Sequence, residues 1–184
     1  MVKQQIDMEL NTPFNLKQWI DENRELLKPP VGNKNLYINS GNFIVMVVGG
    51  PNARKDYHYN ETEEFFFQLE GTIQVAIQTE KGKEMITLNE GDVFLLPAKV
   101  PHSPVRSEGS VGLVVETKRE GQNTKDGLLW FCEDCNEKLY EVYFELNNIE
   151  TDFLPHFKHF YQSETLRTCK NCGNTMEADQ RFIG

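Results

Sequence analysis

Two histidines and one glutamate of this 184-residue chain have the residue types and spacing expected of ligands to a single metal ion. His58 and Glu64 lie in the segment GPNARKDYHYNETEEFFFQLEG, and His102 lies in GDVFLLPAKVPHSPVR. Because a β-barrel brings the ends of separate hairpins together at its mouth, ligands far apart in sequence can meet there. Two imidazoles and one carboxylate form the facial arrangement of non-haem Fe(II) sites, which leaves other coordination positions open. The sequence therefore predicts one Fe(II) held by His58, Glu64 and His102.

Four cysteines form a second candidate metal site. They occur as two Cys-x-x-Cys pairs, Cys132 with Cys135 and Cys169 with Cys172. Two such pairs supply the tetrahedral set of four thiolates that suits iron or zinc. A redox disulfide is the alternative, but no thioredoxin-like pattern adjoins either pair. We expect one iron or zinc ion here, with the mainly structural role of tying the C-terminal segment together.

Short strands are the elements that must position the first site. The predicted strands are Phe43–Val48, Glu64–Leu69, Thr72–Gln78, Glu84–Leu88, Asp92–Leu96 and Gly112–Glu116. Turn residues such as Glu70-Gly71 and Asn89-Glu90-Gly91 separate them. Many short strands at regular spacing indicate an antiparallel sandwich or barrel, so we expect a mainly β fold.

The chain divides into three predicted parts. Residues 1–35 hold an amphipathic helix, which starts at Asn11-Thr12-Pro13, ends at Pro29-Pro30 and packs on the barrel. Residues 36–120 form the barrel with the first metal site. The polar stretch Lys118–Gly127 serves as a linker to residues 121–184, which hold the cysteine site. Within this last part we expect a strand at Lys138–Leu146 and a short helix at Thr151–Tyr161.

Composition limits the partners of the protein. The net charge is −9, from 28 acidic and 19 basic residues, so a nucleic-acid partner is not expected. The longest apolar run, Phe43–Val48, has the length of a strand and not of a membrane span. The segment MVKQQIDMELNTPF lacks the apolar stretch of a signal peptide, so we expect a cytoplasmic protein without a membrane partner.

The spacings around the first site resemble the two signature motifs of the cupin superfamily. Glu64 is followed by Gly71 at the interval of the first motif, and Gly91, Pro97 and His102 are in register with the second. Asn60 stands where the first motif usually has a second histidine, so three ligands remain instead of four. The resemblance implies a cupin fold, a jelly-roll barrel also described as a double-stranded β-helix.

Three longer strings resemble the 3-hydroxyanthranilate 3,4-dioxygenase family. They are KPPVGN (Lys28–Asn33), GPNARKDYHYNETEEFF (Gly50–Phe66) and PHSPVR (Pro101–Arg106). The two Cys-x-x-Cys pairs resemble those of its bacterial and fungal single-cupin form. The resemblance implies a homodimeric Fe(II) enzyme that uses O2 to open the ring of 3-hydroxyanthranilate. The implied product is 2-amino-3-carboxymuconate semialdehyde, on the route to quinolinate and NAD.

Three further residues then acquire expected roles. Arg106 offers a two-pronged guanidinium to the substrate carboxylate. By resemblance Arg54 contacts O2, and Glu116 contacts the substrate together with Glu64. The alternatives are that the two arginines form surface salt bridges and that Glu116 is simply solvated at the end of a strand.

Two other functions remain open on the residues alone. One is a cupin isomerase or epimerase that acts on a sugar-like anion with a redox-inert metal. The other is a non-catalytic ligand-binding cupin. A three-ligand site flanked by arginines favours the dioxygenase over the isomerase, because its open face suits O2 and a chelating aromatic. A sensor would usually carry a DNA-binding segment, which the sequence lacks.

Overall fold

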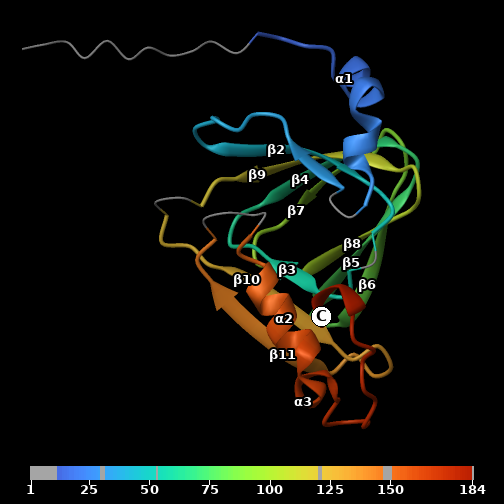
Figure 1. Cartoon of the computed structure of the whole chain (residues 1–184), viewed down its shortest axis with the longest axis vertical. Coiled ribbons are helices and arrows are strands. Elements are labelled where there is room, and N and C mark those ends of the chain that lie inside the picture. The colour runs from blue at the N-terminus through green and yellow to red at the C-terminus, as the bar shows by residue number, and fades with distance from the viewer. Residues whose placement is uncertain (1–11, 30–31, 53, 120–121, 147–150, 184) are drawn as a thin grey trace, which may run out of the picture.

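Two antiparallel sheets form the body of the protein (Figure 1). The structure, a computed structural model, describes residues 12–29, 32–52, 54–119, 122–146 and 151–183. The first sheet contains, in spatial order, β1 (Asn33–Asn35), β2 (Phe43–Gly49), β9 (Val111–Thr117), β4 (Glu64–Glu70) and β7 (Val93–Leu96). The second contains β11 (Lys138–Phe144), β10 (Asp126–Phe131), β3 (Tyr57–Tyr59), β8 (His102–Arg106), β5 (Ile73–Thr79) and β6 (Gly82–Leu88). This arrangement confirms the predicted cupin fold.

The main core lies between the two sheets, and both contribute to it. Its buried members are Ile44, Met46, Phe66, Ile73, Val75, Ile77, Leu88, Leu96 and Val114. In β4, buried side chains alternate with half-buried ones, so Glu64, Phe66 and Gln68 all face inward. The same alternation that builds the core therefore places one carboxylate inside the barrel.

The six predicted barrel strands are confirmed, with ends that differ by one or two residues. Two strands that the sequence did not predict, β3 and β8, carry His58 and His102. β3 is only three residues long and β8 contains Pro104, so neither shows a clear apolar alternation. Each forms a strand because it pairs with neighbours: β3 with β8 and β10, and β8 also with β5.

The N-terminal helix α1 (Leu16–Asn23) begins later than predicted. Its N-cap is Asn15, whose Oδ1 accepts a hydrogen bond of 2.9 Å from the backbone N–H of Gln18. The predicted start at Thr12-Pro13 was therefore wrong, and Asn11 lies outside the described residues. Of the two prolines predicted to end the helix, Pro29 is among the described residues and Pro30 is not.

A 3-10 turn, η1 (Arg24–Leu27), continues α1 toward the barrel. Ile20 of the helix and Leu27 of the turn are buried against Val47 of β2 and Val111 of β9. The predicted packing of this helix on the barrel is confirmed.

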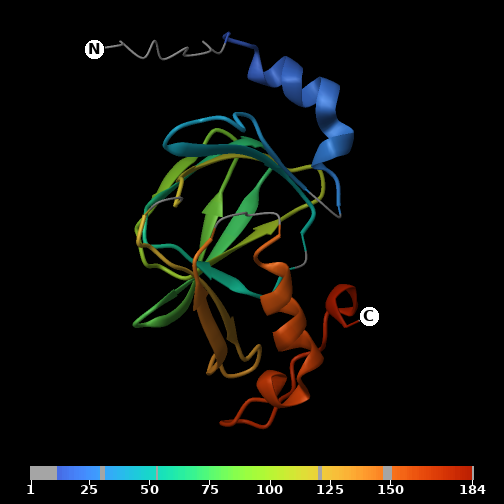
Figure 2. The same cartoon turned by 60° about the vertical axis from the view of Figure 1, so that its left-hand side comes forward.

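The C-terminal segment continues the second sheet. Its strand β10 pairs with β3, and β11 follows at the edge, beside the helix α2 (Leu154–Gln162) (Figure 1, Figure 2). Trp130 of β10 stacks on Phe160 of α2 with ring centroids 4.3 Å apart, and both side chains are fully buried. The short helix α3 (Glu164–Arg167) and the 3-10 turn η2 (Gln180–Phe182) complete the segment.

The start of β10 corrects one prediction. Asp126 and Gly127 were assigned to the linker, but both belong to β10 and are buried. The predicted strand at Lys138–Leu146 and the helix at Thr151–Tyr161 are present as β11 and α2. Among the described helices, none is long and apolar enough to cross a membrane.

Candidate metal centre and active site

The structure brings His58, Glu64 and His102 together inside the barrel. One possible ligand atom from each lies within 4.8 Å of the others. His58 and His102 are directly paired across β3 and β8, and Glu64 begins β4 in the opposite sheet. All three side chains are buried, and no residue of the set is more than 9% exposed. Pairing between strands therefore converts distant sequence positions into one compact donor set.

Hydrogen bonds and charges prepare this set for a cation. Nδ1 of His102 lies 3.1 Å from the carbonyl oxygen of Val100, while its Nε2 lies 2.9 Å from Oε2 of Glu64. A ring held at one nitrogen by a carbonyl presents the other to a metal. Burial by itself lowers the pKa of His102 and raises that of Glu64. The attraction between the two side chains outweighs burial, so the pKa of His102 is raised and that of Glu64 is lowered. Two imidazoles and a carboxylate this close together fit a divalent first-row metal, which binds the histidines in their neutral form.

A cavity of about 190 Å³ opens beside the three donors. Its lining also includes Arg54, Arg106 and Glu116, which are the three other residues predicted to act on substrate or O2. Aromatic and aliphatic side chains complete the wall, among them Phe66 and Phe153. Charged and polar side chains thus converge in a small cavity with a partly apolar wall, as they do in many ligand sites.

Arg106 is a buried cation directed into this cavity. It is only 4% exposed, and within the described part of the chain its Nη1 has no hydrogen-bond partner. Burial lowers its pKa to about 10, which leaves the guanidinium charged at neutral pH. The absence of a side chain at Gly112 makes room for it, since a Cβ there would lie 3.0 Å from Nη1. A surface salt bridge is therefore excluded for Arg106.

Arg54 reaches the same cavity from the loop before β3, and it is already paired. Its Nε donates a hydrogen bond of 3.0 Å to Oδ1 of the buried Asp56. The guanidinium also lies over the rings of Phe153 and Phe157, 5.9 Å and 5.5 Å from their centroids. The ion pair expected as the alternative role does exist, but its partner is interior and the arginine lines the pocket.

Glu116 is buried and not solvated. It lies opposite Glu64 in the register of β4 and β9, and Nη2 of Arg119 is 2.6 Å from its Oε2. Burial raises the pKa of Glu116, and the negative charge of Glu64 raises it further, against the opposing effect of Arg119. The carboxylate is therefore more basic than an ordinary glutamate, which suits a group that accepts a proton.

Besides Asp56, three residues that lie around His58 and Glu116 were missed in the sequence. Oδ1 of Asp126 lies 2.7 Å from Nε2 of His58, Arg119 links Asp126 to Glu116, and the ring of Phe153 is 5.5 Å from that of His58. Both charged residues fall in the stretch that reads as a polar linker, and Phe153 lies beyond it. No local pattern distinguishes them from solvated or core residues.

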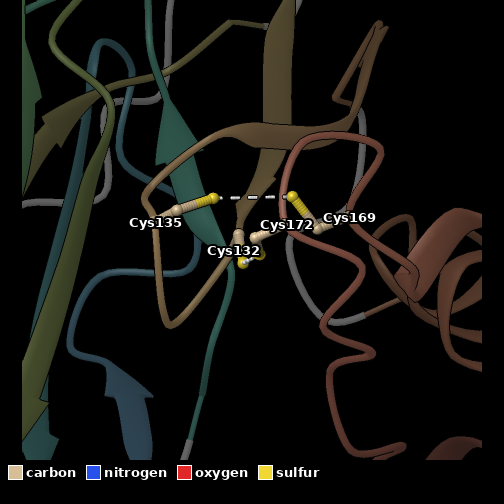
Figure 3. Close-up of side chains that lie close together, drawn as sticks. All are labelled: Cys132, Cys135, Cys169 and Cys172. Carbon is tan, nitrogen blue, oxygen red and sulfur yellow. Dashed lines mark hydrogen bonds between the residues drawn. The ribbon is translucent and has the colours of Figure 1, made fainter.

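The four cysteines also converge. Figure 3 shows Cys132, Cys135, Cys169 and Cys172 at the junction of two loops, and all four sulfurs lie within 4.8 Å of one another. The Sγ atoms of Cys132 and Cys172, and those of Cys135 and Cys169, are 3.5 Å apart, too far for a disulfide bond.

Both cysteine loops turn in the same way. The backbone N–H of Asn136 donates to the carbonyl of Cys132, and that of Gly173 donates to the carbonyl of Cys169, each at 3.0 Å. Asn136 and Gly173 both have positive φ angles, 59° and 79°. A backbone N–H bond from Glu137 lowers the pKa of Cys135 to about 7, which favours the thiolate form. The geometry fits a four-sulfur metal site.

Replacing Cys169 by serine should destabilise the C-terminal segment. Metal binding to four thiolates contributes directly to folding, so we expect the loss of one metal per chain and a melting temperature lower by about 10 °C. Thermal unfolding and metal analysis test this, with Lys170→Ser as a neighbouring exposed control. An unchanged melting temperature with full metal content would contradict the structural role.

The fold and the first site together define a cupin-type protein with a buried His-Glu-His centre. The sequence model of the family described as 3-hydroxyanthranilic acid dioxygenase matches residues 8–161, so the chain belongs to this family. A protein from Xanthomonas euvesicatoria pv. vesicatoria named 3-hydroxyanthranilate 3,4-dioxygenase is 56% identical over 170 residues, covering 92% of this chain and 95% of that protein.

One further relative is similar in sequence, and one solved structure is similar in fold. A protein of the same name from Bacillus thuringiensis is 48% identical over 164 residues, which cover 89% of this chain and 90% of that protein. Among solved structures, a cupin-2 domain protein from Shewanella frigidimarina has a TM-score of 0.45 at 20% identity. The aligned region covers 54% of this chain and 92% of that one.

Proposed function

We propose that this chain is a 3-hydroxyanthranilate 3,4-dioxygenase, a non-haem Fe(II) enzyme of the extradiol type. It opens the ring of 3-hydroxyanthranilate with O2 to give 2-amino-3-carboxymuconate semialdehyde, which leads to quinolinate and NAD. The observation that carries the proposal is the cavity beside His58, Glu64 and His102, in which a buried guanidinium lacks a hydrogen-bond partner for its Nη1 within the described residues. Membership of the family and the names of its relatives supply the substrate.

Each polar side chain of the cavity has a separate proposed role toward the substrate or O2. Arg106 binds the substrate carboxylate through two parallel hydrogen bonds, which offset the cost of its burial. Glu116 accepts the phenolic proton, and Glu64 borders the substrate from the opposite strand. Arg54, held by Asp56, contributes positive charge where O2 is reduced.

His58, Glu64 and His102 are the residues that would hold the iron. Bound there, Fe(II) would supply a path for electron density from the aromatic ring to O2. The protein contributes orientation, through Arg106, and apolar side chains such as Phe66 and Phe153 that line part of the cavity.

One assay tests the proposed reaction. Protein loaded with Fe(II) without oxygen, then mixed with 3-hydroxyanthranilate and O2, should consume both in equal amounts and form the absorbing semialdehyde. An isomerase or a binding protein would take up no O2 under these conditions. Full iron occupancy without O2 uptake would overturn the proposal.

The cysteine site is proposed to hold a second iron or a zinc ion with a structural role. Ring opening by O2 inserts both oxygen atoms into the product and needs no external electrons, so no electron carrier is required. Four metal-binding thiols also suit a reducing compartment, and we propose a cytoplasmic location.

We further propose a homodimer that works without nucleic acid or a membrane. The family resemblance supports the dimer, and the net charge of −9 opposes binding to phosphate backbones. Light scattering should give twice the chain mass of 21.3 kDa, and a monomer at micromolar concentration would contradict the dimer.

A further inference from the structure

An arginine and an aspartate are buried beside the proposed site without touching its cavity. Arg119 is 5% exposed and Asp126 is 1% exposed, although both lie in or next to a stretch of polar sequence. Neither belongs to the predicted ligand set or lines the cavity. Charged residues are rarely buried this deeply unless they are paired, so their contacts identify what they do.

These contacts form one continuous chain of polar atoms. Oδ1 of Asp126 lies 2.7 Å from Nε2 of His58 and 3.0 Å from Nη2 of Arg119. The same Nη2 lies 2.6 Å from Oε2 of Glu116. Arg119 also donates from Nη1 to the carbonyl oxygen of Thr117, 3.2 Å away. One guanidinium therefore connects the carboxylate behind His58 to the carboxylate that faces Glu64.

The fold explains how residues so distant meet. Arg119 follows the end of β9, and Asp126 begins β10, which pairs with β3 so that Leu128 lies opposite His58. The connection between β9 and β10 thus brings both charges behind the histidine. The carboxylates of Glu64, Glu116 and Asp126 are all buried, and Arg119 contacts those of Glu116 and Asp126.

We propose that Asp126 and Arg119 are positioning residues of the dioxygenase site, Asp126 for the ring of His58 and Arg119 for both Asp126 and Glu116. The inference rests on the proposed function for the role of Glu116. A histidine that binds a metal commonly donates its other ring N–H to a carboxylate, which fixes the ring and increases its basicity. Arg119 in turn prevents the two carboxylates from repelling one another and holds each at a defined oxygen.

A purely structural ion pair would behave differently when it is changed. It would affect the stability of the fold and leave the metal affinity of the folded protein unaltered. A positioning pair should change metal affinity and catalysis even in folded protein at a temperature well below unfolding. The experiment must therefore measure binding separately from folding.

The first variant is Asp126→Asn, which keeps the shape of the side chain and removes its charge. The protein is first given one equivalent of Zn²⁺ to fill the cysteine site, and Fe(II) is then titrated without oxygen against a competing chelator. We expect Asp126→Asn to bind Fe(II) about 10- to 100-fold more weakly than the unmodified protein. The control Asp179→Asn removes a carboxylate paired with Arg181 in the C-terminal segment and should change the affinity less than twofold.

The second variant separates the two halves of the proposal. Arg119→Met should weaken Fe(II) binding and, at saturating iron, still lower kcat/KM for 3-hydroxyanthranilate at least tenfold, because Glu116 loses its partner. Arg119→Lys keeps the charge and should recover part of that loss. Asp126→Asn leaves both Arg119 and Glu116 in place, so it should regain most of its kcat/KM when iron is saturating.

The two variants test the roles of Asp126 and Arg119 separately. An Fe(II) affinity of folded Asp126→Asn equal to that of the control would overturn the role of Asp126. A value of kcat/KM for iron-saturated Arg119→Met equal to that of the unmodified protein would overturn the role of Arg119 at Glu116. If Asp126→Asn does not fold by circular dichroism, Arg119→Met takes its place in the titration, and an Fe(II) affinity equal to that of the unmodified protein counts against the proposal. Failure of the proposed function itself is distinguishable, since the titration contains no substrate.

Discussion

Replacing His102 by alanine should abolish both iron binding at the barrel site and ring opening. The imidazole is one of three buried donors and contacts the carboxylate of Glu64 at 2.9 Å, and alanine supplies no donor atom in its place. Metal ions contribute several kcal/mol to such reactions, and we expect turnover to fall by at least about 10³-fold. Iron analysis after anaerobic loading should give one metal per chain, at the cysteine site, where the unmodified protein holds two.

The control for this change is His159→Ala. His159 is exposed on α2 and belongs to neither donor set, so its loss should leave metal content and turnover unchanged. Oxygen uptake and the absorbance of the semialdehyde measure turnover in both variants. A His102→Ala protein that still holds two metals and opens the ring would disprove the assignment of the triad.

Replacing Arg106 by alanine should raise the KM for 3-hydroxyanthranilate about 10- to 100-fold and leave the iron content near normal. The guanidinium is buried, charged and without a protein partner at Nη1 among the described residues, so the substrate carboxylate is the group expected to neutralise it. A hydrogen bond to a charged group contributes about 1.5–3 kcal/mol, which corresponds to this change in KM.

Two further variants serve as controls for Arg106→Ala. Arg106→Lys keeps the charge but loses the two-pronged geometry, so its KM should lie between those of the unmodified protein and Arg106→Ala. Arg24→Ala removes an exposed arginine that pairs with Glu70 outside the site, and it should leave KM unaltered. Unchanged steady-state KM in Arg106→Ala would argue against the carboxylate-binding role.

Much of the site could be predicted because its chemistry is local in the sequence. The paired cysteines, and the histidines and glutamate beside glycine- and proline-marked turns, are recognisable by residue type and spacing alone. The strands of the main core were also predictable, since an inward-facing side chain at every second position leaves a clear pattern. Glu64 was predicted as a ligand from its spacing, but the apolar residues Phe65, Phe67 and Leu69 alternate out of phase with it, so its inward direction came from the tertiary structure.

Other features depend on pairing between distant strands. β3 and β8 have little apolar alternation of their own, and they become strands only because β10 and β5 flank them. Asp126 and Arg119 carry charges that ordinarily mark solvated sequence, so nothing local indicated burial.

The His58–Glu64–His102 set was therefore determined by the sequence, through ligand type and spacing. The residues that surround these three ligands could be identified only from the tertiary structure. The pairing of β10 with β3 places Asp126 behind His58, and the packing of α2 on β10 and β11 brings Phe153 against the same ring. Ligand identity is a property of single residues, whereas the partner of a buried charge is set by which strands lie side by side.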